Sequence, residues 1–123
     1  MTSRVFVVDD NQQIRRMLSQ ILSLDFDVVG VAADGEEAIE GVSDADPDVV
    51  IVDYMMPGID GIETAKAIRT KRPEQPILLY TAFLDGDIED RARQAGVFEC
   101  VTKLDGPVAL ERAIRRISGE QIF

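Results

Sequence analysis

Residues 49–58 read Val-Val-Ile-Val-Asp-Tyr-Met-Met-Pro-Gly, which is a β-branched run followed by an aspartate and then by a Pro-Gly pair. A short β-branched run without polar alternation predicts a strand that is covered on both faces. Pro57 and Gly58 favour a loop rather than a helix directly after this strand. The stretch therefore predicts a buried strand that ends at Asp53, with the Asp53 side chain left free in a loop.

Apolar runs of the same kind occur four more times, at residues 5–8, 28–32, 77–80 and 98–101. Apolar residues at helical spacing follow each run, in five groups: Ile14, Leu18, Ile21 and Leu22; Ala38, Ile39 and Val42; Ile62, Ala65 and Ile68; Ile88, Ala92 and Ala95; Leu110, Ala113, Ile114 and Ile117. This alternation predicts an α/β doubly wound domain, with a five-stranded parallel sheet buried on both faces and right-handed crossovers. Residues 118–123 are expected to fray.

Length and charge restrict the class of protein. A chain of 123 residues suits a single domain, which we expect to span residues 1–123. The formal net charge of −10 opposes direct binding to nucleic acid or to anionic lipid. No apolar run approaches the roughly 20 residues that cross a bilayer, and the first residues lack the pattern of a secretory signal. The sequence therefore predicts a cytoplasmic protein that binds neither membrane nor nucleic acid.

The sequence contains no histidine and one cysteine, Cys100. These counts exclude a Ser-His-Asp or Cys-His nucleophile, a histidine zinc site and an intrachain disulfide. Any chemistry must therefore use carboxylates, hydroxyls, lysines and a metal held by oxygen ligands.

Polar residues follow four of the predicted strands. Asp9 and Asp10 follow the first, Asp53 the third, Thr81 the fourth and Lys103 the fifth. A single such aspartate is most simply a helix cap, but the carboxyl ends of parallel strands gather at one edge of the sheet. Three carboxylates brought together there repel one another, and Lys103 or Mg²⁺ would relieve that repulsion.

An ionised carboxylate beside a metal can attack phosphorus without a separate base. We expect Asp53 to be this nucleophile, because the Pro-Gly loop leaves its side chain in the crevice. The Lys103 ammonium and the Thr81 hydroxyl would each hold an oxygen of the phosphoryl group.

Four segments together carry a family resemblance: Val7-Val8-Asp9-Asp10, residues 51–61, Tyr80-Thr81-Ala82 and Val101-Thr102-Lys103. In this order and over essentially the whole chain, the pattern resembles the receiver domain of bacterial two-component response regulators. The resemblance implies a flavodoxin-like fold with strand order 2-1-3-4-5. It also implies that Asp53 accepts a phosphoryl group from a sensor histidine kinase or a phosphotransfer protein, which would supply the histidine that this chain lacks.

The resemblance further implies a role for each site residue. Asp9 and Asp10 become the acids that bind Mg²⁺, with Asp10 the nearer ligand, and the backbone carbonyl of Met55 completes the protein ligands beside Asp53. Thr81 and Lys103 become the pair that senses the phosphoryl group. Catalysis would be limited to assisting the domain's own phosphorylation and dephosphorylation. Output would pass to a partner or an attached domain through the face of the fourth helix, fifth strand and fifth helix, with homodimerisation on phosphorylation.

Two positions depart from the family pattern. Receivers usually carry Tyr or Phe where Cys100 stands, and Pro where Leu104 stands. Without that ring, we expect the conformational change to come mainly from loop and backbone shifts. Of the two phenylalanines nearby, Phe98 is expected in the core and Phe83 in a loop.

Two other functions compete with a signalling module. The first is a small Mg²⁺-dependent phosphohydrolase with an aspartyl-phosphate intermediate, although no recycling general acid is evident. The second is a flavodoxin-like cofactor binder, in which Asp9 and Asp10 would repel the cofactor's phosphate. No GxGxxG or GxxxxGK[ST] sequence supports nucleotide binding.

Overall fold

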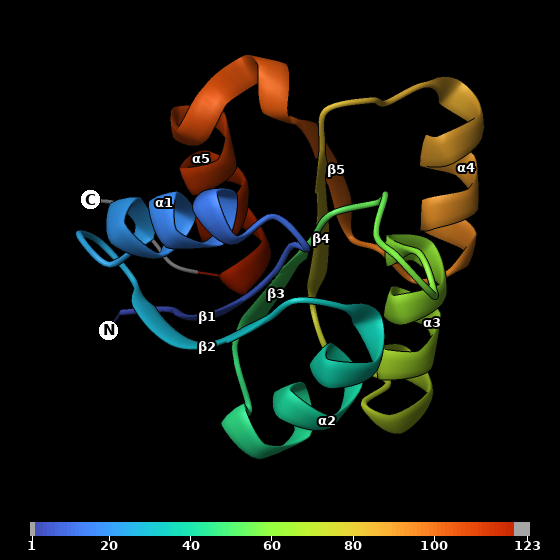
Figure 1. The fold of residues 1–123 in the computed structure, drawn as a ribbon, viewed down its shortest axis with the longest axis horizontal. Coiled ribbons are helices and arrows are strands. Elements are labelled where there is room, and N and C mark those ends of the chain that lie inside the picture. The colour runs from blue at the N-terminus through green and yellow to red at the C-terminus, as the bar shows by residue number, and fades with distance from the viewer. Residues whose placement is uncertain (1, 120–123) are drawn as a thin grey trace.

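The computed structural model describes residues 2–119, in which strands and helices alternate along the chain (Figure 1). The elements are β1 (Arg4–Val8), α1 (Gln12–Leu22), β2 (Asp27–Ala32), α2 (Gly35–Ala45), β3 (Val49–Val52), α3 (Gly61–Lys71), β4 (Ile77–Thr81), α4 (Gly86–Gln94), β5 (Glu99–Thr102), a 3₁₀ turn η1 (Lys103–Asp105) and α5 (Gly106–Ser118). All strand pairs are parallel, and the order is β2-β1-β3-β4-β5. The predicted fold class and strand order are confirmed.

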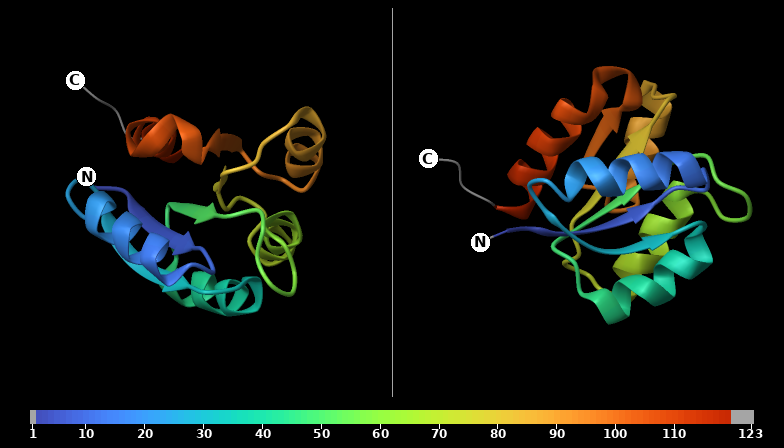
Figure 2. Two further views of the ribbon diagram at one scale, coloured as in Figure 1. Left: turned by 45° about the horizontal axis from the view of Figure 1, so that its top comes forward. Right: turned by 60° about the vertical axis from the view of Figure 1, so that its left-hand side comes forward.

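Two apolar cores lie on opposite faces of the sheet. One joins side chains of α2, α3 and α4 to the sheet, and the other joins side chains of α1 and α5 to the opposite face. Figures 1 and 2 show these helices as layers on either side of the strands. Every residue of β3 and of β4 is buried. Two covered faces explain why the run at residues 49–52 has no polar alternation.

The edge strands do not match the prediction of burial on both faces. Ala32 is the only buried residue of β2 and Val101 the only buried residue of β5, since each strand has a neighbour on one side alone. Strand β5 also begins one residue later than predicted. Phe98, expected in the core, precedes the strand with 50% of its surface exposed, and its ring lies under the Arg69 guanidinium at 5.2 Å. Phe83 lies in the β4–α4 loop, as predicted.

Four helices that start at the carboxyl edge of the sheet have an N-cap residue whose side chain bonds to the first turn. In each, the cap accepts a hydrogen bond from the backbone N–H three residues later; the caps are Asn11, Asp34, Asp60 and Asp85. Helix α5 differs, because Asp105 makes no side-chain cap bond and η1 intervenes after β5. Lys103 is thus the first residue of the 3₁₀ turn η1.

Within residues 2–119, no helix has the length and apolar character that crossing a membrane requires. Ser118 is the last residue of α5, and Gly119 follows it in the left-handed conformation. Of the residues predicted to fray, 118 therefore still belongs to α5, 119 is its C-cap, and residues 120–123 lie outside the described part of the chain.

Candidate functional site

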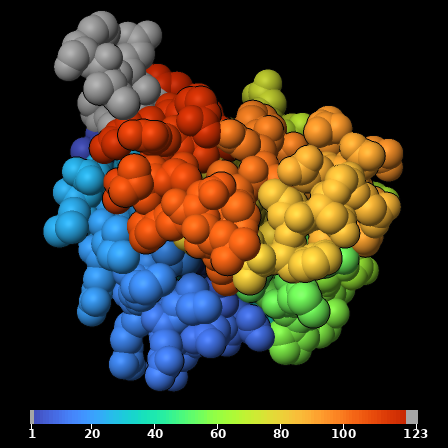
Figure 3. All heavy atoms as spheres, turned by 90° about the horizontal axis from the view of Figure 1, so that it is seen from above, coloured from blue at the N-terminus to red at the C-terminus, as the bar shows by residue number. Residues whose placement is uncertain are grey.

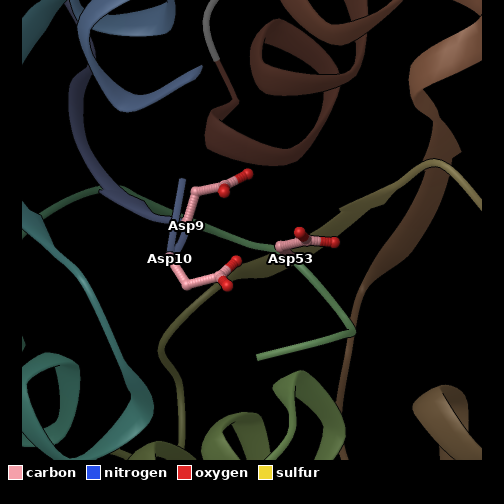
Figure 4. A group of neighbouring side chains, drawn as sticks. All are labelled: Asp9, Asp10 and Asp53. Atoms are coloured by element: carbon pink, nitrogen blue, oxygen red, sulfur yellow. The ribbon is translucent and has the colours of Figure 1, made fainter. Parts of the chain in front are cut away.

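The three predicted acidic residues meet at the carboxyl ends of β1 and β3. The neighbouring strands fix their main chains: the Asp53 N–H donates to the Val8 carbonyl at 3.0 Å, and the Asp9 N–H donates to the Ala32 carbonyl at 3.1 Å. One carboxylate oxygen from each of Asp9, Asp10 and Asp53 lies within 4.8 Å of the other two. Figure 4 shows Asp9 and Asp10 extending from β1 toward the end of β3, where Asp53 lies.

Asp9 is the buried and fully bonded member of the cluster. It is 2% exposed; its Oδ1 accepts from the backbone N–H of Asn11 at 2.9 Å, and its Oδ2 accepts from the Lys103 ammonium at 2.9 Å. Arg15 Nη1 donates to the Asp9 carbonyl oxygen at 2.6 Å. Asn11 and Arg15 were not predicted from the sequence, although an asparagine after two aspartates is a recognisable N-cap signal. These contacts fix the Asp9 main chain and side chain.

Asp10 lies beside Asp9 but is exposed to solvent. Within residues 2–119, no side chain or backbone group hydrogen-bonds or ion-pairs with its carboxylate. It borders a hollow of about 450 Å³ whose other lining residues are Tyr54, Met55, Met56, Pro57 and Asp60. Of the three acids, Asp10 is therefore the one most available to an added ligand.

Two further residues complete the cluster: Thr81 at the end of β4, and Lys103 at the start of η1. The Lys103 ammonium lies 2.9 Å from Asp9 Oδ2 and 3.2 Å from Asp53 Oδ2, and the lysine side chain is 18% exposed. Thr81 is buried at the end of β4, near the Asp53 carboxyl, and its hydroxyl acts to lower the pKa of that carboxyl. All five predicted side chains thus come together from four strand ends.

The electrostatics of the cluster favour an added cation. Burial raises the pKa of the Asp53 carboxyl above its ordinary value; attraction to Lys103 opposes this rise, and repulsion from Asp9 adds to it. Burial alone would lower the pKa of Lys103, but the hydrogen bond to Asp9 and the charge of Asp53 raise it above its ordinary value. Asp9 and Asp53 therefore share one protonated ammonium, and the Asp10 carboxylate beside them has no positive partner among residues 2–119.

The donor set suits a hard divalent cation. Mg²⁺ prefers oxygen ligands, and it commonly binds one or two carboxylates together with water and phosphate oxygens. Asp9, Asp10 and Asp53 offer carboxylate oxygens at one point, and Asp10 has no competing partner among the described residues. The residues present fit such an ion.

Gly61 holds the loop that follows Asp53. Its N–H donates to the Tyr54 carbonyl at 2.7 Å. A Cβ at position 61 would lie 2.1 Å from the carbonyl oxygen of Asp53, a contact too short for any side chain. The first turn of α3 is therefore packed directly against the backbone of the predicted acceptor. This role of Gly61 could not be predicted from the sequence, because its conformation is helical and only its surroundings require a glycine.

Cys100 lies on β5, half-buried against the core that α2, α3 and α4 form with the sheet. Burial raises the pKa of its thiol to about 11, so the thiol stays protonated at neutral pH. It borders a hollow of about 240 Å³ with Glu89, Arg93, Val97, Phe98 and Glu99. Cys100 thus packs as a small side chain against this core, although it is only partly buried.

The chain matches known proteins over its full length. The family model of the response regulator receiver domain matches residues 5–115. The response regulator protein VraR of Staphylococcus aureus is 34% identical over 126 residues, a match that covers 100% of this chain and 60% of that protein. The chain thus spans about three fifths of the length of the curated relatives it matches.

Solved structures agree with the sequence match. A LuxR-family two-component response regulator from Aurantimonas sp. SI85-9A1 superposes with a TM-score of 0.93 at 31% identity, covering 98% of this chain and 88% of that one. The response regulator domain of Thermotoga maritima CheB gives a TM-score of 0.90 at 30% identity, covering 99% and 100%. The resemblance found in the sequence is confirmed: this chain belongs to the response regulator receiver domain family, the signalling domains of two-component systems.

Proposed function

We propose that this domain accepts a phosphoryl group on Asp53 from the phosphohistidine of a sensor histidine kinase or a phosphotransfer protein. The observation that carries this proposal is the placement of the Asp53 carboxylate. It lies 3.2 Å from the Lys103 ammonium and within 4.8 Å of two further carboxylates. A nucleophile, a cation for a phosphoryl oxygen and a set of metal ligands are thereby within reach of one incoming phosphorus atom.

In this proposal Mg²⁺ would be held by the carboxylates of Asp9, Asp10 and Asp53 and by the backbone carbonyl of Met55. When bound, the ion would offset the negative charge shared by the Asp53 carboxylate and the phosphoryl oxygens. Asp10 would be the ligand most free to turn toward the ion, because its carboxylate is exposed and has no partner among residues 2–119, whereas Asp9 already bonds to Asn11 and Lys103.

The transfer forms one bond and breaks one. An Asp53 carboxylate oxygen attacks phosphorus, the bond from phosphorus to the donor nitrogen breaks, and its electron pair remains on the donor's imidazole. The Lys103 ammonium, which contacts the Asp53 carboxylate, and the Thr81 hydroxyl near it turn to the new phosphoryl oxygens. Since the carboxylate is the nucleophile, no histidine of this chain is needed for the attack. Any catalysis is confined to the domain's own phosphorylation and dephosphorylation.

The output of this proposed switch is an altered surface over α4, β5 and α5, read by a partner or by an attached output domain, with homodimerisation as one form of readout. Residues 1–123 are proposed to act as one cytoplasmic receiver domain that does not itself contact nucleic acid. The relatives extend beyond the matched region, so contacts of further domains in a full-length protein are a separate matter.

Asp53→Asn tests the proposal. Incubated with Mg²⁺ and acetyl phosphate, the parent is expected to gain the mass of one phosphoryl group, and the variant none, because its neutral amide is a poor nucleophile. Intact-protein mass spectrometry measures both. An equal mass gain in the variant would place the phosphoryl group elsewhere.

Thr81→Ala should separate phosphorylation from the response to it. The variant keeps Asp53 and Lys103, so the mass gain is expected to remain, but the hydroxyl that contacts a phosphoryl oxygen is gone. Amide chemical shifts with and without beryllofluoride, a phosphoryl mimic, should therefore change less over residues 82–86 than in the parent. A full response in Thr81→Ala would assign the coupling to another residue.

A further inference from the structure

Tyr54, the residue after Asp53, reaches across to α4. Its hydroxyl accepts a hydrogen bond from Arg91 Nη1 at 3.2 Å, and the Arg91 guanidinium lies 5.9 Å from the centre of the Tyr54 ring. Asp87, one turn earlier on α4, is 3.6 Å from the same guanidinium. Among the described residues, no other hydrogen bond or ion pair joins the segment between β3 and α3 to α4. In Figure 3 the green segment after β3 lies against the gold residues of α4.

The main chain of Tyr54 cannot shift independently of Asp53. The Tyr54 carbonyl accepts from the Gly61 N–H at 2.7 Å, and a Cβ on Gly61 would come within 3 Å of both the Asp53 carbonyl and the Tyr54 Cα. The Tyr54 ring packs against the core shared with α3 and α4. A displacement of the Asp53 backbone therefore displaces the tyrosine with it.

Helix α4 is connected to the site at two points. Its first turn is connected through residues 82–85, which follow Thr81. Its second turn is connected through Arg91, whose pKa is raised by the hydrogen bond to Tyr54 and by the nearby charges. Ile88 and Ala92 hold α4 on the core, so its position responds to both attachments, and the one at Arg91 acts one turn further along the helix than residues 82–85.

We propose that the Tyr54–Arg91 contact is a second coupling between the acceptor site and α4, independent of Thr81. Through it α4 follows the loop that carries Asp53, so that phosphorylation at Asp53 moves the α4 surface. Tyr54 and Arg91 are positioning residues in this scheme. The inference rests on the proposed function, because it specifies how the same site reaches its output surface.

Arg91→Gln tests the coupling, and Arg93→Gln is its matched control. Arg93 lies on the same helix and loses the same charge, but it pairs with Asp90 and makes no contact with Tyr54. Exposed ion pairs contribute little to stability, so both variants should fold. The measurement is the change in amide chemical shift on adding beryllofluoride and Mg²⁺, recorded separately for residues 53–60 and for residues 86–94.

In the parent and in Arg93→Gln, both segments should respond. In Arg91→Gln, residues 53–60 should respond as in the parent, while the shifts of residues 86–94 fall by roughly half or more. Tyr54→Phe, which keeps the ring, should show a smaller loss, and the double variant with Arg91→Gln should lose no more than Arg91→Gln alone. Parent-like shifts of α4 in Arg91→Gln, or additive losses in the double variant, would overturn the inference. Absence of any response at residues 53–60 in the parent would instead overturn the proposed function.

Discussion

Asp10→Asn is expected to remove Mg²⁺-dependent phosphorylation of Asp53. Changes to groups that merely orient metal ligands lower metal affinity by about 10–100-fold, so loss of a charged ligand should lower it at least as much. The metal-free variant should be more stable than the parent toward denaturant, because one of three clustered like charges is gone. Isothermal titration with Mg²⁺ and mass spectrometry with acetyl phosphate measure the two effects.

Asp44→Asn is the control for this prediction. Asp44 is an exposed residue of α2, so the substitution makes the same change of charge outside the carboxylate cluster. It should leave both Mg²⁺ affinity and phosphorylation at the parent's level. If Asp10→Asn binds Mg²⁺ as tightly as the parent, Asp10 is not a ligand and the proposed metal site is wrong.

Gly61→Ala should be strongly destabilising although it adds only a methyl group at a helix start. That methyl would lie 2.1 Å from the Asp53 carbonyl oxygen, and the atoms it meets are backbone atoms that cannot rotate away. Overpacking of this kind costs about 1–3 kcal/mol of unfolding free energy. Because the clash falls on Asp53, the rate of phosphorylation should fall as well. Urea denaturation followed by circular dichroism measures the stability.

Gly86→Ala is the matched control. Gly86 also occupies the first position of a helix, α4, but an added Cβ there would meet no atom within 4 Å. Alanine is a better helix former than glycine, so this variant should gain up to about 1 kcal/mol. Equal denaturation midpoints for Gly61→Ala and the parent would show that the loop after Asp53 is not packed as described.

The sheet could be predicted from the sequence because its central strands are buried on both faces. Residues 49–52 and 77–80 are apolar without interruption, as expected of strands that are buried on both faces. At the edges of the sheet, the same reasoning gave the wrong environment for Phe98. Its side chain is half exposed beneath an arginine, and the sequence alone does not distinguish such a phenylalanine from one in the core. What decides its surroundings is the position of Arg69 on α3, which a local pattern does not contain.

The acidic cluster could be predicted for a different reason. Parallel strands place their carboxyl ends at one edge, so Asp9, Asp10 and Asp53 had to come close once β1 and β3 were neighbours. The contacts that depend on side-chain reach could not be predicted in this way. Tyr54 and Arg91 are 37 residues apart, and neither belongs to a motif with a fixed spacing. Their contact follows from how α4 lies beside α3 and the loop that precedes it.

The most direct test of the central claim is to locate the phosphoryl group chemically. Borohydride reduces an aspartyl phosphate to homoserine, so the parent treated with Mg²⁺ and acetyl phosphate, reduced and digested, should contain homoserine at position 53. Fragment mass spectrometry reads that position directly, and a sample without acetyl phosphate should retain aspartate there. Homoserine at position 9 or 10, or at none of the three aspartates, would contradict the assignment of Asp53 as the phosphoryl acceptor.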